Sequence, residues 1–396
     1  TLYSINLSIL IHELLNIFKY ILEFYKSFTM AMVKFGVIGG GIAARFHLAA
    51  CKNSSKVKFV AIYDVVEKSA KRVARAYKLR PYADLDAFLD SDIEAVLVAV
   101  PHYLHEEMVL SVAKAGKHVL CEKPMATTLE GCDKMIDATR KAGVKFMVAE
   151  NHRFLPAHRW IKDAVQKGWI GRPFLIRSYE GVNEIPGLMQ PDLWKGHPIK
   201  AGGGALMDMG AHKFAILQWI LGTSVESAYA WITKQCTTLQ EKAEDNAMVF
   251  LKYKSGVIAE TVVSFTVVTP PTNQLEIHGT QGSIVENHAW EHPIKINSFH
   301  KDLGINRGRW YEPPVEHGIY PKYYDISARM EDEYFAKCIL ENEDPEFMPE
   351  DAKSAVATVL LSYLSAELGR TVTYSELEKI YRTKGTMYIL ENILSA

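Results

Sequence analysis

Apolar and polar positions alternate in two different periods between residues 33 and 151. Short β-branched runs predict strands at Lys34–Ile38, Val57–Asp64, Glu94–Val100, His118–Glu122 and Lys145–Glu150. Longer stretches of helical composition lie between them, at Glu67–Lys78, His105–Ala115 and Leu129–Lys141. Strands that alternate with helices require right-handed crossovers, so this pattern predicts a parallel, doubly wound sheet.

The length of the chain, 396 residues, is sufficient for two domains that each bury a core. We expect an α/β protein with a doubly wound Rossmann domain over 32–151, a second α/β domain over 152–374 and a C-terminal tail over 375–396. Residues 1–31 form an extension of different composition, since 1–29 contain no Gly, Ala, Val, Pro, Asp or Arg.

This extension has two interpretations. It is leader sequence that precedes a start at Met30 or Met32, or it is an amphipathic helix, because Leu14, Leu15 and Phe18 belong to a series of apolar residues at helical spacing. Polar and charged residues interrupt the apolar series, which argues against a transmembrane span and a signal peptide.

Charge and cysteine content narrow the classes of partner. Lys and Arg number 45 and Asp and Glu 46, so no excess of positive charge favours nucleic acid or an anionic membrane. A small-molecule partner fits better. The five cysteines are scattered and form no C-x-x-C pair, which argues against a disulfide framework and a structural zinc site. We therefore expect a cytoplasmic protein.

A glycine-rich turn follows the first predicted strand. Gly39-Gly40-Gly41-Ile42-Ala43-Ala44 forms a G-x-G-x-x-A element, in which Gly39 allows the tight turn and Gly41 lets the backbone approach a pyrophosphate. The helix that begins at Ile42 and Ala43 faces the phosphates with its N-terminus. Asp64 ends the second strand twenty residues after Ala44, where its carboxylate can bind ribose hydroxyls and repel a 2′-phosphate. NAD is the predicted cofactor.

Open α/β sheets bind ligands at the carboxyl ends of their strands, and three further motifs lie at such ends. These are Val100-Pro101 followed by His105, Glu122-Lys123-Pro124, and Asn151-His152-Arg153-Phe154. The ammonium of Lys123 can polarise a substrate oxygen there. A solvated loop lysine is the alternative.

A second polar motif follows a run of glycines. Asp208 and His212 are four residues apart, so on a helix they share one face, where the carboxylate can orient the imidazole as a general base. A surface ion pair is the alternative. His102 and His105 have tolerable spacing for metal ligation, but no H-E-x-x-H or cysteine ligand joins them, and we expect no metal.

These motifs together resemble the glucose–fructose oxidoreductase, inositol dehydrogenase and rhizopine catabolism (Gfo/Idh/MocA) family. The likeness extends from about Met32 to Val372 and includes Gly202-Gly203-Gly204-Ala205-Leu206 before Asp208. The resemblance implies a second domain with a large, open, mostly antiparallel sheet that forms homodimers or homotetramers. It also implies that Lys123, Asp208 and His212 form the catalytic group. Val100 departs from the family, where Thr is usual.

The expected function is NAD-dependent hydride transfer to or from a secondary hydroxyl or ketone of a sugar, cyclitol or glycoside. His212 would move the proton and Lys123 would stabilise the alkoxide. The cofactor site would comprise Gly39, Gly41, Ile42, Ala43, Asp64, Val100, Pro101, His105, Glu122 and Lys123. The substrate site would comprise Arg153, Tyr179, Trp194, Asp208 and His212, with His105 as a further candidate. Two alternatives are a glycosidase that oxidises its substrate transiently with bound NAD, and a nucleotide-sensing regulator without activity.

Overall fold

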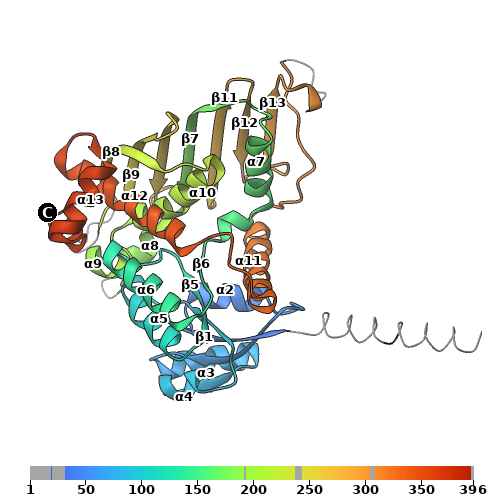
Figure 1. Ribbon diagram of the computed structural model, residues 1–396, viewed down its shortest axis with the longest axis vertical. Coiled ribbons are helices and arrows are strands. Elements are labelled where there is room, and N and C mark those ends of the chain that lie inside the picture. Colours follow the sequence, from blue (N-terminus) through green and yellow to red (C-terminus); the bar gives the residue numbers. More distant parts are fainter. Residues whose placement is uncertain (1–18, 20–31, 191–192, 237–242, 304–307, 394–396) are drawn as a thin grey trace, which may run out of the picture.

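The computed structural model describes residue 19 and residues 32–190, 193–236, 243–303 and 308–393. Two sheets, each accompanied by helices, form two lobes of the molecule (Figure 1). Among the described helices, none is both long and apolar enough to cross a membrane. Both interpretations of the N-terminal extension fall outside the described residues.

The first sheet confirms the doubly wound prediction. Its strand order is β3-β2-β1-β4-β5-β6, and every neighbouring pair is parallel. The strands are β1 (Val33–Ile38), β2 (Val57–Tyr63), β3 (Arg80–Tyr82), β4 (Ala95–Val98), β5 (His118–Glu122) and β6 (Phe146–Ala149). The three-residue edge strand β3 was not predicted, because it is short and contains Pro81.

Helices cover both faces of this sheet, since alternate strand residues point to opposite sides. Phe35 and Val37 pack toward α2 and α3, whereas Ile38 packs in the core that α5 and α6 cover. The helices are α2 (Ile42–Ala50), α3 (Glu67–Tyr77), α4 (Leu85–Leu89), α5 (His105–Lys114) and α6 (Leu129–Ala142).

The second sheet has the order β13-β12-β11-β7-β10-β9-β8-β14. Only β7 and β10 pair in parallel among these described strands, so the sheet is mostly antiparallel, as the resemblance implied. The strands are β7 (Pro173–Gly181), β8 (Val225–Thr233), β9 (Asn246–Tyr253), β10 (Ile258–Ser264), β11 (Thr272–Gly279), β12 (Gly282–Asn287), β13 (Ile294–Ser298) and β14 (Val372–Thr373).

Helices pack on one face of this second sheet, and one helix returns to the first. The long helices are α7 (Pro156–Gln166), α10 (Ala211–Leu221), α11 (Lys322–Glu341), α12 (Pro349–Leu368) and α13 (Tyr374–Lys384), and the short ones are α8 (Ile185–Leu188), α9 (Pro198–Ala201) and α14 (Met387–Ile393). Figure 1 shows α11 beside α2 of the Rossmann lobe. There the rings of Phe35 and Phe335 lie 6.3 Å apart.

The glycine run before Asp208 is held by a buried carboxylate. Glu244 accepts hydrogen bonds from the backbone N–H groups of Gly204 and Leu206, at 3.0 and 2.9 Å. Tyr363 donates to the same carboxylate at 2.8 Å. Burial raises the pKa of Glu244 to about 7, against the effect of these donors. A π-helical turn at Leu206–Gly210 follows and leads directly into α10.

Gly204 and Gly222 allow a test of how tightly this segment is packed. A Cβ on Gly204 would overlap the backbone oxygen of Glu244. A Cβ on Gly222 would have no described atom within 4 Å, and the only cost there is the φ of +62°, which residues with a side chain rarely adopt. We expect G204A to lower the free energy of unfolding by about 3 kcal/mol or more. G222A should cost about 1 kcal/mol. Urea denaturation measures both, and equal losses would contradict the structural account.

Candidate active site

The glycine turn after β1 has the shape that a pyrophosphate needs. Gly39 has a φ of +97°, and a Cβ there would overlap the carbonyl oxygen of Ala99. A Cβ on Gly41 would meet no atom of the described residues within 4 Å, and no described side chain caps the helix that begins at Ile42. The N-terminus of α2, with Ile42 and Ala43, therefore faces open space that suits an anion.

Asp64 secures this turn. Its Oδ2 accepts from the N–H of Gly40 at 2.8 Å, and its Oδ1 accepts from the N–H of Val66 at 2.8 Å. Carboxylate oxygens have further lone pairs, so these bonds leave capacity for ribose hydroxyls. Val65 and Val66 are exposed beside it and offer no cation to a 2′-phosphate. The residues present fit NAD.

His105 does not have the role that the sequence suggested. It is fully buried, and its ring nitrogens lie 2.9 Å from the carbonyl oxygen of Pro124 and 3.0 Å from that of Val100. The imidazole connects two strand ends and cannot reach a substrate. The prediction of substrate contact by His105 is wrong, because its ring is directed into the protein. Val100 and Pro101 follow β4 beside the glycine turn.

Lys123 at the end of β5 binds Asp208 of the other lobe. Its Nζ donates to Oδ1 of Asp208 at 2.6 Å and to the backbone oxygen of Asp208 at 2.9 Å. Lys195 lies 3.1 Å from the second carboxylate oxygen and 3.4 Å from Glu184. One carboxylate therefore lies between two ammonium groups.

These contacts determine the protonation of the pair. Burial opposes the charged form of Lys123, but the attraction and the hydrogen bond of Asp208 outweigh it and raise the pKa of Lys123. Burial also opposes ionisation of Asp208, and the two ammonium groups outweigh it, so that the pKa of Asp208 lies well below its usual range. Both groups are charged at neutral pH.

The carboxylate partner of His212 is Glu150. The Nδ1 of His212 lies 2.6 Å from Oε1 of Glu150, which follows β6. With Nδ1–H donating to this carboxylate, the neutral ring has its lone pair on Nε2 and can act as a base. The prediction that Asp208 orients His212 is therefore wrong. Lys123 and Lys195 engage both oxygens of Asp208 instead.

A second imidazole supports the first. The rings of His152 and His212 stack with centroids 4.2 Å apart and planes 14° apart. Burial holds the pKa of His152 well below its usual range, so this ring is neutral. A neutral neighbour restricts the orientation of His212 without repelling the imidazolium that a general base becomes.

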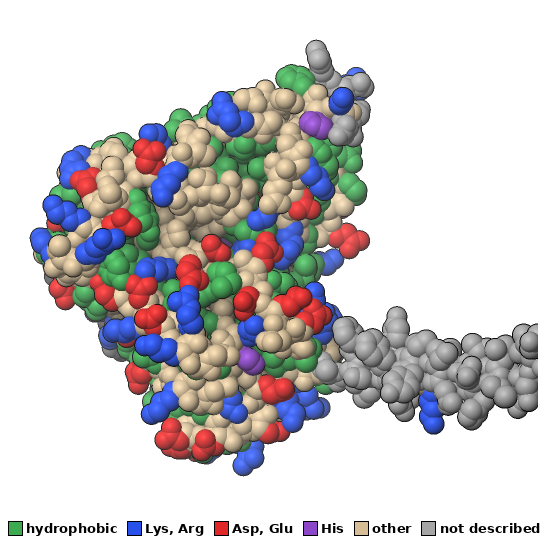
Figure 2. Space-filling view, in the orientation of Figure 1, with side chains coloured by type: hydrophobic (Ala, Val, Ile, Leu, Met, Phe, Trp, Pro, Cys, Tyr) green, Lys and Arg blue, Asp and Glu red, His purple; other side chains and the backbone are tan. Residues whose placement is uncertain are grey.

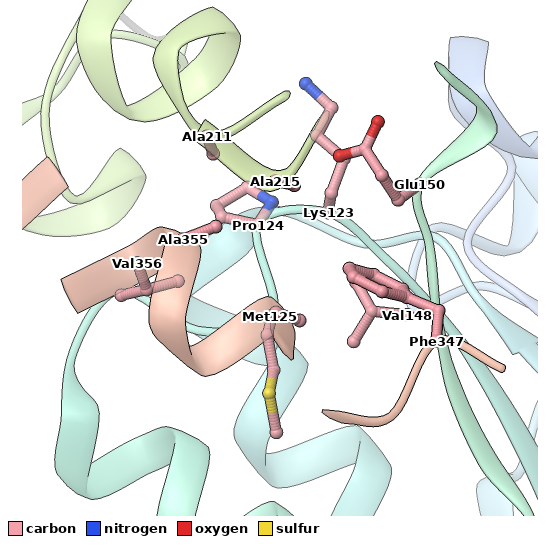
Figure 3. Close-up of a pocket in the computed structure, with 11 residues that line it drawn as sticks. Lys123, Pro124, Met125, Val148, Glu150, Ala211, Ala215, Phe347, Ala355 and Val356 are labelled. Carbon is pink, nitrogen blue, oxygen red and sulfur yellow. The ribbon is translucent and has the colours of Figure 1, made fainter. Parts of the chain in front are cut away.

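Lys123 and Glu150 line a common cavity of about 10 Å³, room for about one water molecule. Figure 3 shows the Lys123 ammonium and the Glu150 carboxylate at one end of this cavity, with Met125, Val148 and Phe347 further down. The Lys123 and Glu150 side chains thus lie together at one end of the cavity, and apolar side chains line the rest of it.

Glu122 supports Lys123 from behind. Its Oε2 accepts from the backbone N–H of Lys123 at 3.0 Å, and its Oε1 lies 3.1 Å from Nε2 of His47. The other nitrogen of His47 lies 2.8 Å from Asp332 on α11. Burial opposes protonation of His47, but the two carboxylates raise its pKa well above the usual value. The resulting imidazolium holds Glu122 in place.

Two predicted substrate contacts lie elsewhere. Arg153 is buried, with its guanidinium 4.6 Å from the ring of Trp219 and 4.3 Å from that of Phe347, so it has a packing role. Tyr179 points to the open face of the second sheet, because its neighbour Glu180 faces Lys213 on α10 and successive strand residues point to opposite faces. Both predictions of substrate contact are corrected.

Trp194, in contrast, lies near the catalytic groups. Its ring is 4.7 Å from that of His102, edge to face, and Lys195 follows it in the chain. The sequence reasoning missed Lys195 and Glu150. Glu150 ends a predicted strand, the position that had identified Lys123, and that signal could have found it. Lys195 has no comparable local signal.

Comparison with family models matches both lobes of the chain. The model described as "Oxidoreductase family, NAD-binding Rossmann fold" matches residues 33–150, and the "GFO/IDH/MocA C-terminal domain" matches residues 158–285. The first range contains the whole first sheet, and the second contains β7 to β11 and part of β12 of the second sheet.

Relatives and solved structures point the same way. The myo-inositol 2-dehydrogenase of Thermotoga maritima is 30% identical over 352 residues, which are 87% of this chain and 99% of that protein. The 1,5-anhydro-D-fructose reductase of Ensifer adhaerens is 38% identical over 196 residues, 50% of this chain and 57% of the reductase. The structure of levoglucosan dehydrogenase with NADH and L-sorbose has a TM-score of 0.79 at 24% identity and covers 87% of this chain and 99% of that one. At that identity it shows the shared fold.

Asp64 should make the site prefer NAD over NADP, because its carboxylate accepts from a ribose diol and repels a phosphate. We expect D64S to narrow the ratio of the two dissociation constants by about tenfold or more. The matched control is D92S, which removes the exposed ion pair with Lys34. Titrations of both nucleotides at one ionic strength measure the ratio. Tighter binding of NADP by the unaltered chain would contradict the role of Asp64.

Proposed function

The chain belongs to the Gfo/Idh/MocA family of NAD-binding oxidoreductases, and from this premise we propose that it oxidises a secondary hydroxyl of a sugar, cyclitol or glycoside, or reduces the matching ketone. The observation that carries the proposal is the meeting of Lys123 with the His212–Glu150 pair at the carboxyl edge of the first sheet. When bound, NAD supplies the hydride acceptor or donor.

Proton transfer falls to His212. Its Nε2 takes the hydroxyl proton while Nδ1–H continues to donate to Glu150, whose carboxylate stabilises the imidazolium that forms. In the opposite direction the imidazolium returns the proton to the oxygen. The neutral ring of His152, stacked on His212, keeps the base aligned throughout.

Stabilisation of the oxyanion falls to Lys123. The attraction of Asp208 keeps its ammonium protonated despite burial, so a positive charge is in place before the substrate oxygen becomes negative. Asp208 thus acts on Lys123, and Glu150 acts on His212. Each reacting group has a carboxylate of its own.

A neutral polyhydroxyl substrate fits the charges around these groups. Asp208, Glu184 and Lys195 present both acceptors and donors in the partly buried segment beside Trp194. Donors and acceptors at fixed positions select hydroxyl groups, and an indole provides a face on which a sugar ring packs. The sugar and cyclitol enzymes among the relatives support the same substrate class.

Surface charge, an exposed apolar patch and the free cysteines support three further features of the proposal. Acidic and basic side chains are intermixed on the face that Figure 2 shows, which favours a small-molecule partner over nucleic acid. Trp231, Met248 and Phe250 are exposed on the open side of the second sheet and would form the contact in a homodimer or homotetramer. The cysteines of the described residues are free, which fits a reducing cytoplasm.

Variants of the two carboxylates should separate their roles. H212A should lower kcat by about 10²–10⁴-fold, the range for loss of a general base, with NAD affinity unchanged. E150Q should lower kcat less, because the imidazolium loses its partner, and should leave the alkaline limb of the pH profile in place, because Lys123 keeps its contacts with Asp208. D208N should move the alkaline limb to lower pH, since burial then lowers the pKa of Lys123. Full activity in H212A, or identical profiles for E150Q and D208N, would refute the mechanism.

A panel of sugars, inositols and glycosides incubated with NAD tests the proposed reaction. We expect reduced nicotinamide to accumulate with at least one member and H212A to abolish it. Release of an aglycone without net NADH would identify the transient-oxidation glycosidase instead. Tight NAD binding without turnover of any member, in either direction, would favour a nucleotide-sensing protein.

A further inference from the structure

A cluster of buried histidines around one carboxylate lies beneath the second sheet, outside the catalytic group. It contains His158 at the start of α7, Glu286 on β12, and His288 just after β12. All three are at least 98% buried. The Nε2 atoms of His158 and His288 lie 3.1 and 2.7 Å from the two oxygens of Glu286.

The hydrogen bonding of His158 leaves a conflict in this cluster. Its Nδ1 lies 2.8 Å from the backbone carbonyl oxygen of His152, which can only accept, so Nδ1 bears the proton. In a neutral ring Nε2 then has a lone pair, and it faces a carboxylate oxygen of Glu286. Either a proton, held by the ring or by the carboxyl group, or a metal ion must lie between these two acceptors.

His317 is an independent sign of a missing partner. It is 1% exposed, and neither of its ring nitrogens has a hydrogen-bond partner among the described residues. Its ring lies 4.6 Å from that of His288, whose Nδ1 is also unpartnered there. Buried polar nitrogens without partners are costly and rare, and several in one place indicate a ligand.

We propose that His158, Glu286 and His288 bind a divalent transition-metal ion, with His317 as a fourth ligand after rotation of its ring. The ligating atoms of His158, Glu286 and His288 already lie within 4.8 Å of one another. On a tetrahedral ion with bonds of about 2.0–2.1 Å, ligand atoms are about 3.3 Å apart, so the side chains need small shifts only. Two or three imidazoles and one carboxylate favour Zn²⁺, Co²⁺ or Ni²⁺ over Mg²⁺ or Ca²⁺.

The surroundings of His158 fit such an ion. The carbonyl that receives the Nδ1–H of His158 is the kind of outer partner that orients a metal-bound histidine.

The ion would stabilise the base of the catalytic group without entering the reaction. His158 bonds the carbonyl of His152, and the ring of His152 stacks on His212. Binding to α7, β12 and the segment of His317 at once would secure three parts of the chain. We therefore expect metal loading to act first on thermal stability.

Titration of the chelator-treated full chain with Co²⁺ tests the site, since tetrahedral Co²⁺ gives visible absorption bands. We expect one equivalent to bind with those bands and to raise Tm. H288Q and E286Q should weaken binding by about tenfold or more. H317Q tests the fourth ligand and changes no residue that Glu286 contacts. The matched control is H278Q, which alters a partly exposed histidine 3.6 Å from Glu276 and should leave binding intact.

Three results would overturn the proposal. These are no Co²⁺ or Zn²⁺ uptake by the unaltered chain, uptake that H278Q removes, and uptake that H288Q, E286Q and H317Q all retain. The first would leave a proton between His158 and Glu286, held by the ring or by the carboxyl group. Should H288Q and E286Q fail to fold, the spectrum and stoichiometry of the unaltered chain and of H317Q still decide.

Discussion

The ion pair of Lys123 with Asp208 joins the two lobes at the candidate active site. Lys123 ends a strand of the first sheet, and Asp208 lies on the π-helical turn before α10 of the second lobe. Both groups are partly buried, so removal of one leaves a charge that has lost its partner in a poorly solvated place. The glycine run and the Glu244 carboxylate beneath it both act on the position of Asp208 in this pair.

The two carboxylates between the lobes, Asp208 and Glu150, contact different groups. Asp208 lies between Lys123 and Lys195 and keeps an ammonium charged, whereas Glu150 lies against His212 and supports a base that must gain and lose a proton. Both oxygens of Asp208 are taken by ammonium groups, so the imidazole has a second carboxylate, Glu150, as its partner. The separation is a consequence of bringing β6 and α10 together.

Local motifs predicted the parts of this protein that depend on local geometry. The glycine turn, Asp64 and Lys123 could be singled out because strand ends and tight turns require particular residues nearby. The prediction that Tyr179 contacts the substrate failed because successive strand residues point to opposite faces, and the sequence alone did not show which face Tyr179 occupies. The prediction of the partner of His212 failed because Glu150 is 62 residues away in the sequence. The four-residue spacing of Asp208 and His212 cannot reveal that two ammonium groups bind the Asp208 carboxylate.

Packing, and not the ion pairs, sets the distances in the site. One apolar cluster extends from Val96 and Val119 of the first sheet to Val249 and Ile277 of the second, and α12 contributes to it. On the other side α11 covers Phe35 with Phe335. Each 100 Å² or so of apolar surface exposed by separating the lobes would cost about 2.5 kcal/mol, whereas an exposed charge contact contributes about 1 kcal/mol or less. The apolar core therefore fixes how far Lys123 lies from Asp208, and that distance then determines which groups are charged.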